Sequence, residues 1–327
     1  MSSHPGSLRK ILYVAMRYDY GRKEQGTSFE FNNFYRTLGR LVPQVVEFDS
    51  MTLMQEHGRE AMNRMLVDAA EREQPDLIFF CLFTDEILPE TIAKLTGQCT
   101  TYNWFCDDHW RFSNFSKFYA PHFSFVSTTD PDAVPRYKKI GYDHALITQW
   151  ACNHYDYRLM PDVKKEYDVT FIGQPHGNRK RVVAYLRSHG INIQPFGRGW
   201  ENGRVSQEEM IRIFNASKIN LNLSNSSWNI HTIFRGQQQI KGRNFEIPGS
   251  GGFILTNHVQ GIEQSYDIGK EIVCFRNRRD LLHLIGYYLS HETEREQIAR
   301  AGYERTLREH TYERRFRELF THMGFSL

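Results

Sequence analysis

The sequence has few cysteines, and none of them form a motif typical of a metal site or a redox centre. Its 327 residues include five cysteines, Cys81, Cys99, Cys106, Cys152 and Cys274. No Cys-x-x-Cys pair occurs among them, which argues against a disulfide framework and against a zinc site. The histidines form no His-Glu-x-x-His motif. We therefore expect no bound metal, reduced thiols and a cytoplasmic protein.

An excess of charge of one sign is also missing, and so are long hydrophobic runs. The formal net charge is +3, from 41 basic and 38 acidic residues, so the chain lacks the basic surplus typical of proteins whose main partner is nucleic acid. No apolar run approaches the roughly 18 residues of a membrane-spanning helix. Residues 1–7 lack the apolar core of a signal peptide. These features predict a soluble protein without a transmembrane segment, and they are compatible with a peripheral place on a membrane surface.

Apolar runs of strand length alternate with amphipathic segments along the whole chain. A length of 327 residues accommodates two domains of roughly 150 residues each. The alternation of strands and helices predicts an α/β fold with parallel sheets. The polar segment 154–166 is the best linker, so we expect two Rossmann-like domains, residues 1–155 and 156–327, that face each other across a cleft. We expect strands at residues 10–16, 45–49, 77–83, 100–105, 123–130, 145–149, 168–172, 191–196, 219–223, 253–255 and 271–275.

Residues 239–257 combine cations, a carboxylate and glycines. The pattern predicts a short helix that ends in a glycine-rich loop, residues 248–252, and is followed by a buried strand. Bare amides beside cations suit a phosphate, and a carboxylate suits sugar hydroxyls. A solvated helix end is the alternative. We do not expect the charged side chains of this stretch to pack inward together. Its candidate ligand-binding residues are Lys241, Arg243, Glu246, Gly251 and Gly252.

A second candidate phosphate loop begins at Gly173. It follows a predicted strand and precedes a predicted helix, so its amides, with Arg179 or Lys180, suit a phosphate. The pattern is not a Walker loop. An ordinary strand-to-helix turn without a ligand is the alternative.

Asp107, Asp108 and His109 follow a predicted strand. Adjacent carboxylates raise each other's pKa, and histidine titrates near neutrality, so these residues suit a base, an orienting group or a ligand of an acceptor. A polar turn with helix-capping aspartates is the alternative. The pair is not the spaced Asp-x-Asp of a metal-bridged diphosphate site, so magnesium is not implied. The loops 17–27 and 225–228 are also expected to line the cleft.

Several stretches resemble the CgeB-like (spore maturation protein) glycosyltransferases, which have the two-domain GT-B fold. The resemblance covers residue 219 to the end, about a third of the chain, most specifically in INLNLSNSS, QIKGRNFEIPGSGGFILTN, GKEIVCFRNRRDLLHLIGYYL and ERTLREHTYERRF. TYNWFCDDHW and VTFIGQPHGNRKRVV are similar to weaker marks of the family.

The resemblance implies sugar transfer from a nucleotide-activated donor, with the donor on the C-terminal domain and the acceptor on the N-terminal one. It places Glu246 at the donor ribose, Lys241 and Arg243 at cationic positions, and the glycines 251 and 252 at the diphosphate. Many relatives have an Arg where this chain has Gln174, so the diphosphate cation is Arg179, Lys180 or Arg243. It also implies that the final helix, residues 311–323, returns to the N-terminal domain; its apolar stripe needs a partner.

Together, these expectations describe a metal-independent glycosyltransferase whose nucleotide-sugar donor is a co-substrate, with no other cofactor. Lysine, arginine and loop amides stabilise the departing diphosphate. We expect alanine at position 243 or 246 to weaken donor binding without disturbing the fold. Two alternatives stay open: a non-catalytic nucleotide-sugar-binding scaffold, and a nucleotide-sugar epimerase of the same fold. The sugar, the base, the stereochemical outcome and the acceptor, whether glycan, lipid-linked glycan, protein or small molecule, stay open as well.

Overall fold

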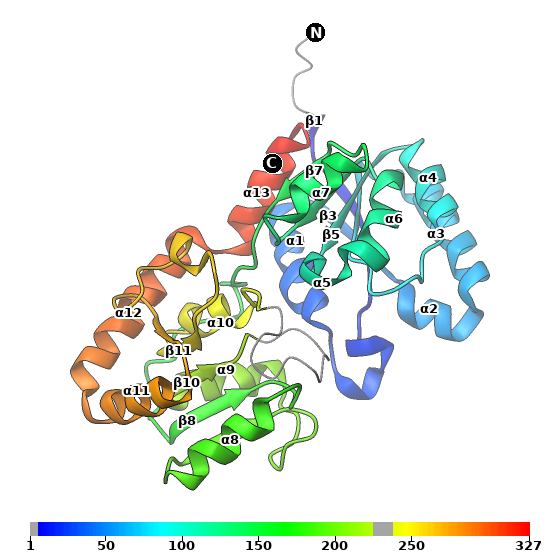
Figure 1. Ribbon diagram of the computed structural model, residues 1–327. Helices are drawn as coiled ribbons and strands as arrows, with labels where there is room; N and C mark the ends of the chain where they lie inside the picture. The colour runs from blue at the N-terminus through cyan, green and yellow to red at the C-terminus, as the bar shows by residue number, and fades with distance from the viewer. Residues whose placement is uncertain (1–5, 225–237) are drawn as a thin grey trace. The chain divides into compact units, whose positions relative to one another are not determined.

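A computed structural model describes residues 6–224 and 238–327. The chain divides into two compact units (Figure 1). The N-terminal unit consists of Met1–Gln149 together with Tyr312–Leu327, and the C-terminal unit is Trp150–Thr311. The domain boundary expected from the sequence lay between residues 155 and 156. The expected loop 225–228 lies outside the described residues.

The N-terminal unit contains a six-stranded parallel sheet with the strand order β3-β2-β4-β5-β6-β7. Its strands are nearly continuous apolar runs, as expected when helices cover both faces of a parallel sheet. Their bounds are Lys10–Ala15 (β2), Gln44–Asp49 (β3), Leu77–Phe80 (β4), Thr100–Phe105 (β5), Phe125–Thr128 (β6) and Ala145–Ile147 (β7).

Strand β4 is shorter than its apolar run predicts. The amides of Phe83 and Thr84 donate to the carboxylate of Glu86, at 2.7 and 2.6 Å, and the amide of Leu82 donates to the Asn103 side chain at 3.1 Å. The amide of Cys81 still donates to the carbonyl of Val14, and after it these side-chain acceptors replace the ladder bonds, so the chain turns away from the sheet.

The helices of the N-terminal unit are mostly short. The α-helices are Arg36–Leu41 (α1), Ser50–His57 (α2), Arg59–Glu73 (α3), Pro89–Thr96 (α4), Asp108–Arg111 (α5), Lys117–Tyr119 (α6), Ala133–Lys139 (α7) and Tyr312–His322 (α13). The other helical turns are Asp19–Gly21 (η1), Lys23–Gln25 (η2), Phe31–Tyr35 (η3), Phe112–Ser116 (η4) and Ala120–His122 (η5). A two-residue parallel pair joins β1 (Gly6–Ser7) to β13 (Phe325–Ser326).

The C-terminal helix α13 returns to the N-terminal unit, as predicted, and lies beside α1 (Figure 1). Phe316 and Phe320 are fully buried. The ring of Phe316 lies 5.7 Å from that of Phe34 and 5.6 Å from that of Phe79, measured between centroids. The apolar stripe of α13 therefore forms part of the core beside the six-stranded sheet.

The C-terminal unit contains a five-stranded parallel sheet with the strand order β12-β11-β10-β8-β9. The strands are Tyr167–Ile172 (β8), Ile193–Phe196 (β9), Ser217–Asn222 (β10), Ile254–Asn257 (β11) and Val273–Phe275 (β12). The helices are Arg179–Ser188 (α8), Gln207–Ala216 (α9), Arg243–Gly249 (α10), Arg278–Ser290 (α11) and Glu292–Glu309 (α12), with a further turn at Ile262–Gln264 (η6). Both units thus have the Rossmann-like architecture that the sequence predicted.

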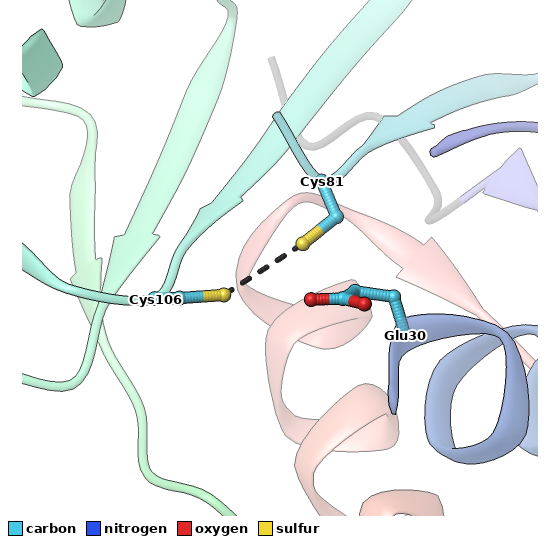
Figure 2. Close-up of side chains that lie close together, drawn as sticks. All are labelled: Glu30, Cys81 and Cys106. Carbon is cyan, nitrogen blue, oxygen red and sulfur yellow. Dashed lines mark hydrogen bonds between the residues drawn. The ribbon is translucent and has the colours of Figure 1, made fainter. Parts of the chain in front are cut away.

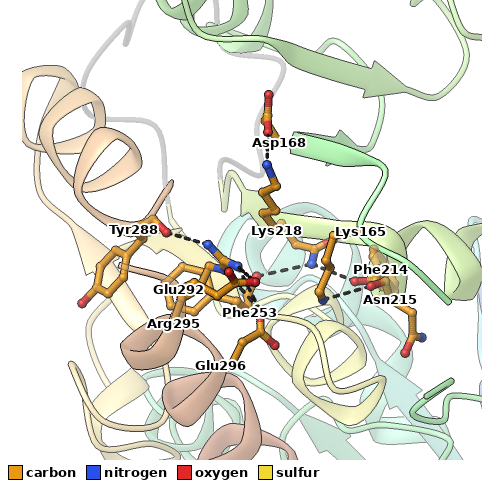
Figure 3. A network of polar contacts seen from close by, with 11 residues as sticks. Lys165, Asp168, Phe214, Asn215, Lys218, Phe253, Tyr288, Glu292, Arg295 and Glu296 are labelled. Carbon is orange, nitrogen blue, oxygen red and sulfur yellow. Dashed lines mark hydrogen bonds and ion pairs between the residues drawn. The ribbon is translucent and has the colours of Figure 1, made fainter. Parts of the chain in front are cut away.

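Helix α12 is fixed by a buried arginine and by a close backbone approach. Arg295, 1% exposed, donates to the carbonyl of Tyr288 at 2.8 Å and pairs with Glu292 and Glu296 (Figure 3). At Gly302 a Cβ would lie 2.3 Å from the carbonyl oxygen of Glu271. Only glycine permits this approach, which brings α12 against the segment before β12, while α12 also packs against α10.

All five cysteines are free in the structure. In the two described stretches of the chain, no helix combines the length and the apolarity that crossing a bilayer requires.

Candidate functional site

The loop after β8 lies at the topological switch point of the C-terminal sheet. Strand β8 has β9 on one side and β10 on the other, so the connections that leave β8 and β10 diverge at its carboxyl end. Ligands of open α/β sheets bind outside the carboxyl ends of the strands at such a point. Residues 173–178, between β8 and α8, occupy this position.

The structure contradicts the predicted phosphate contact of the Gly173 amide. This N–H donates to the carbonyl of Phe196 at 2.9 Å, and the carbonyl of Gly173 accepts from the Trp200 indole at 2.8 Å. A Cβ at position 173 would lie 3.1 Å from the ring of Phe171. A larger side chain would therefore collide with the Phe171 ring, which accounts for glycine at this position. The amide of Gly173 extends the pairing of β8 with β9.

Arg179 joins the two diverging loops. Its guanidinium donates to the carbonyl of Gln174 at 2.8 Å and to the carbonyl of Leu223 at 2.7 Å, and it lies 5.4 Å from the centroid of the Phe171 ring. Burial and, to a lesser degree, the charge of Arg243 lower the pKa of Arg179 to about 10. Arg179 thus stays charged at neutral pH and fixes the switch point, whereas its neighbour Lys180 is exposed.

The residues of α10 form a buried ion pair. Arg243 pairs with Oε2 of Glu246, and the hydroxyl of Tyr157 donates to Oε1 of Glu246 at 2.9 Å. The Glu246 side chain is 0% exposed and that of Arg243 is 26% exposed. We expected the charged side chains of this stretch not to pack inward together; that expectation is wrong for this pair, because each charge compensates the other's burial.

Four basic side chains come from the two predicted stretches, which lie at the carboxyl ends of β8 and β10. Burial lowers the pKa of His176, and the charges of Arg179 and Lys241 lower it further. Arg243 acts on Arg179 in the same way. Hydrogen bonds link the two stretches: Arg179 donates to the carbonyl of Leu223, and the side chain of the adjacent Asn222 donates to Asn244 in α10. The structure therefore brings Arg179, Lys241 and Arg243 together, and it adds His176.

Asn244 holds the start of α10 against the sheet. Its Oδ1 accepts from the amide of Lys241 at 3.0 Å and from the side chain of Asn222 in β10 at 3.2 Å. The side chain of Asn222 also donates to the hydroxyl of Thr256 in β11. This buried network sets the position of Lys241 and Arg243 relative to the carboxyl ends of β10 and β11.

The expected cradle of bare amides at Gly251 and Gly252 is wrong. The amide of Gly251 donates to the carbonyl of Pro248 at 2.8 Å, and the amide of Gly252 donates to that of Ile247 at 3.0 Å. The loop is the C-terminal end of α10, where carbonyls prevail over free amides. A Cβ at Gly252 would lie 2.8 Å from the Asn220 side chain, so close packing accounts for this glycine.

The Asp107–His109 loop lies in the N-terminal unit, after β5. Asp108 is fully buried, and Tyr137 donates its hydroxyl to Oδ2 of Asp108 at 2.7 Å. Burial raises the pKa of Asp108. An acceptor role for Asp108 is therefore contradicted, because its carboxyl group faces the interior. Asp107 and His109 are half-buried at the carboxyl end of β5, where the ligands of such a sheet are expected.

His176, Asn244 and Tyr157 are the site residues that sequence reasoning missed. His176 lies inside the stretch GQPHGNRK, whose loop was identified. Asn244 lies within the stretch 239–257, in which only the charged residues and glycines were identified as candidates. Tyr157 is 89 residues from Glu246, and no local pattern in the sequence links the two.

Similarities to known proteins are found for most of this chain. A family model described as glycosyl transferase-like matches residues 179–321. Among curated proteins, the spore protein CgeB of Bacillus subtilis (strain 168) is 20% identical over 278 residues, which cover 78% of this chain and 84% of CgeB. Residues 179–321, matched by the family model, include Arg179, Lys241, Arg243 and Glu246.

Two solved structures match nearly the whole chain. Sucrose-phosphate synthase from Thermosynechococcus elongatus has a TM-score of 0.64 at 9% identity, with 97% of each chain covered. HepE of Anabaena, in complex with UDP-glucose, has a TM-score of 0.64 at 11% identity, with 96% of this chain and 99% of HepE covered. The chain therefore has the GT-B fold of these structures, and its residues 179–321 are similar to a glycosyl transferase-like family.

Proposed function

We propose that the protein transfers a sugar from a nucleotide-activated donor to an acceptor hydroxyl, and that its C-terminal unit binds the donor. The observation that carries this proposal is that hydrogen bonds at the end of β10 link the loop with His176 and Arg179 to the start of α10, with Lys241 and Arg243, at the switch point of the C-terminal sheet. Cations at that place suit a diphosphate. The complex of HepE with UDP-glucose favours a uridine diphosphate sugar as the donor.

In this proposal Lys241 and Arg243 contact the diphosphate, while Arg179 shapes the loop that receives it. The bond between the sugar's anomeric carbon and the diphosphate oxygen breaks, and a bond from that carbon to the acceptor oxygen forms. Negative charge grows on the departing diphosphate, so fixed cations lower the barrier. Lys241 and Arg243 thus neutralise the charge that a divalent cation neutralises in metal-dependent enzymes. The donor is thus a co-substrate, and transfer is proposed to need neither a metal nor a further cofactor.

The ribose contact of Glu246 remains a prediction. Both carboxylate oxygens have partners in the structure, Tyr157 and Arg243. We propose that Arg243 turns toward the diphosphate when the donor binds, which frees one oxygen of Glu246 for a ribose hydroxyl. Before the donor binds, the ion pair with Glu246 keeps the side chain of Arg243 next to the site.

The acceptor is proposed to bind at the N-terminal unit, at the loop that carries Asp107 and His109. Either side chain can accept the proton that the acceptor hydroxyl loses as it attacks. Asp108 serves only to hold the loop through Tyr137.

Replacing Lys241 by alanine should weaken the binding of UDP-glucose by about ten- to hundredfold, because a hydrogen bond to a charged group contributes about 1.5–3 kcal/mol. Titration calorimetry on the full chain measures this effect. Lys270→Ala is the matched control, since Lys270 is in the same unit and its side chain is 81% exposed. Equal affinities for wild type, Lys241→Ala and Lys270→Ala would contradict the assignment of the donor site.

The affinity for UDP-glucose should rise as the pH falls below the pKa that His176 has in the complex, by up to about tenfold per pH unit. The pKa of His176 in the free chain is lowered, first by burial and then by its cationic neighbours. The negative charge of a bound diphosphate counteracts the positive charges of Arg179 and Lys241. Donor binding therefore raises the pKa of His176 and is coupled to the uptake of a proton. The diphosphate of a sugar donor is fully ionised near neutral pH. Calorimetry at several pH values should show that His176→Gln abolishes the dependence; an identical profile in the variant would exclude His176 from the site.

Product analysis separates the proposal from its alternatives. With a panel of nucleotide sugars and hydroxyl acceptors, a glycosyltransferase yields a new glycoside and a nucleoside diphosphate. A binding scaffold shows donor affinity without turnover. An epimerase yields an altered sugar without any acceptor, and that result would replace the proposed function.

A further inference from the structure

Two cysteines and a glutamate come together at the carboxyl edge of the N-terminal sheet (Figure 2). Cys81 directly follows β4, and Cys106 directly follows β5, the neighbouring parallel strand. Glu30 comes from the turn that precedes η3. The sulfur atoms of the cysteines are 3.7 Å apart, and one oxygen of Glu30 lies within 4.8 Å of both. Figure 2 shows the three side chains pointing toward one another.

The cluster lies where such a sheet ordinarily binds its ligand. Strand β2 has β3 on one side and β4 on the other, so the switch point of this sheet falls between β2 and β4. Glu30 comes from the segment after β2, and Cys81 from the segment after β4. The donor site proposed above lies in the C-terminal unit and uses none of these residues.

The distance between the sulfur atoms fits a shared metal ion better than a disulfide. Two thiolates that bind zinc at about 2.3 Å in tetrahedral geometry are about 3.8 Å apart. The observed 3.7 Å needs almost no adjustment. A disulfide needs sulfur atoms about 2.05 Å apart, so the thiols would have to approach by more than about 1.5 Å.

Glu30 provides the second observation. Its Oε2 is buried, and no hydrogen-bond donor contacts it within the parts of the chain that the structure describes. Buried carboxylate oxygens nearly always have a partner, so this one requires an explanation. The cysteines offer only weak S–H donors. A cation between the three side chains would satisfy the carboxylate and compensate the charge of both thiolates.

We propose that Glu30, Cys81 and Cys106 bind a zinc ion. Two sulfur ligands select zinc over magnesium and calcium, which prefer oxygen. Three protein ligands leave a fourth tetrahedral position for water or another small ligand. The ion ties the segment after β2 to the ends of β4 and β5, and it fixes the start of the loop that continues into Asp107. We assign it no step in sugar transfer. The expectation of no metal rested on spacing along the chain, and the two cysteines are 25 residues apart.

Cobalt, used as a spectroscopic substitute for zinc, tests the proposal on the full wild-type chain. The purified protein is freed of metal under reducing conditions and titrated with Co²⁺. We expect one ion per chain, with sulfur-to-cobalt charge-transfer absorption and the visible bands of a tetrahedral site. Zinc should displace the cobalt and raise the melting temperature, whereas magnesium should do neither. Absence of the thiolate-to-cobalt bands would overturn the proposal. The experiment uses the wild-type chain, so its outcome does not depend on a variant that could fail to fold.

Variants then identify the ligands. Loss of a residue that only orients a ligand lowers metal affinity by about 10–100-fold, so Cys81→Ser, Cys106→Ser and Glu30→Gln should each lower zinc affinity by more than about tenfold. Cys99→Ser is the matched control, because Cys99 is a half-buried cysteine just before the opposite end of β5. Unchanged affinity in all three ligand variants would overturn the proposal. So would a Cys81–Cys106 disulfide, detected by mass, in protein purified without a reductant and unable to bind zinc. Donor binding in the C-terminal unit is measured separately, so either proposal can fail while the other stands.

Discussion

Arg243→Leu should destabilise the C-terminal unit by about 3–5 kcal/mol, because removing one member of a buried ion pair leaves the other charge uncompensated. The stranded group would be Glu246, whose side chain is 0% exposed. Tyr157 would remain as a partner, but a neutral hydroxyl cannot replace a cation. Denaturant unfolding followed by the fluorescence of the C-terminal unit would measure the loss. The sequence alone suggested that this position could be changed without harm to the fold, and the burial of Glu246 reverses that expectation.

The double variant Arg243→Leu/Glu246→Leu is the decisive control. Removing both charges leaves no uncompensated group, so its stability should return to within about 1–2 kcal/mol of wild type. Its affinity for UDP-glucose should nevertheless remain about ten- to hundredfold lower, because the cation that meets the diphosphate is still missing. If the double variant bound UDP-glucose as tightly as wild type, Arg243 would be a structural residue only. If it were no more stable than Arg243→Leu, the ion pair would not be the source of the loss.

Phe316→Ala should destabilise the N-terminal unit by about 3–5 kcal/mol, the usual cost of truncating a buried phenylalanine. Its ring is 0% exposed and lies among Phe34, Phe79 and Trp104, with centroid distances of 5.7, 5.6 and 6.2 Å. The substitution leaves a cavity between α13 and the sheet. Thermal or denaturant unfolding would measure the effect, and unfolding of this unit should come first.

Phe118→Ala is the matched control for that experiment. Phe118 lies in the same unit and is 57% exposed, so its truncation should change the stability by less than about 0.5 kcal/mol. If the two alanine variants unfolded at the same denaturant concentration, α13 would not contribute to the core of the N-terminal unit.

The order of strands and helices was predictable from the sequence because it depends on local patterns. Apolar runs at 100–105 and 168–172 became strands β5 and β8 with nearly the expected bounds. The stripe of α13 was visible as apolar residues at helical spacing, and it is buried as expected. Side-chain periodicity is a property of the backbone geometry, so a single sequence reveals it. The loops at the carboxyl ends of the strands follow from the same information.

The partners of individual side chains could not be predicted in this way. Asp108 and Glu246 are polar residues in polar stretches, yet the fold buries both and supplies tyrosines, Tyr137 and Tyr157, that no nearby pattern suggested. The loop of Gly251 and Gly252 was expected at the end of the helix, but the sequence does not show that their amides donate to the carbonyls of Pro248 and Ile247.

The sequence predicted no metal site, whereas the structure led us to propose a zinc site, and the reason for this difference is again the distance between the residues along the chain. Sequence spacing detects a metal site when its ligands lie on one turn or one hairpin. Cys81 and Cys106 lie on different strands and meet Glu30 only because β4 and β5 pair in parallel and the segment after β2 lies against their ends. The sequence by itself determined the fold class, the order of the elements and the loops at the carboxyl ends of the strands. Only the tertiary structure decided which charges are compensated and which ligands converge, because those contacts depend on packing between residues far apart along the chain.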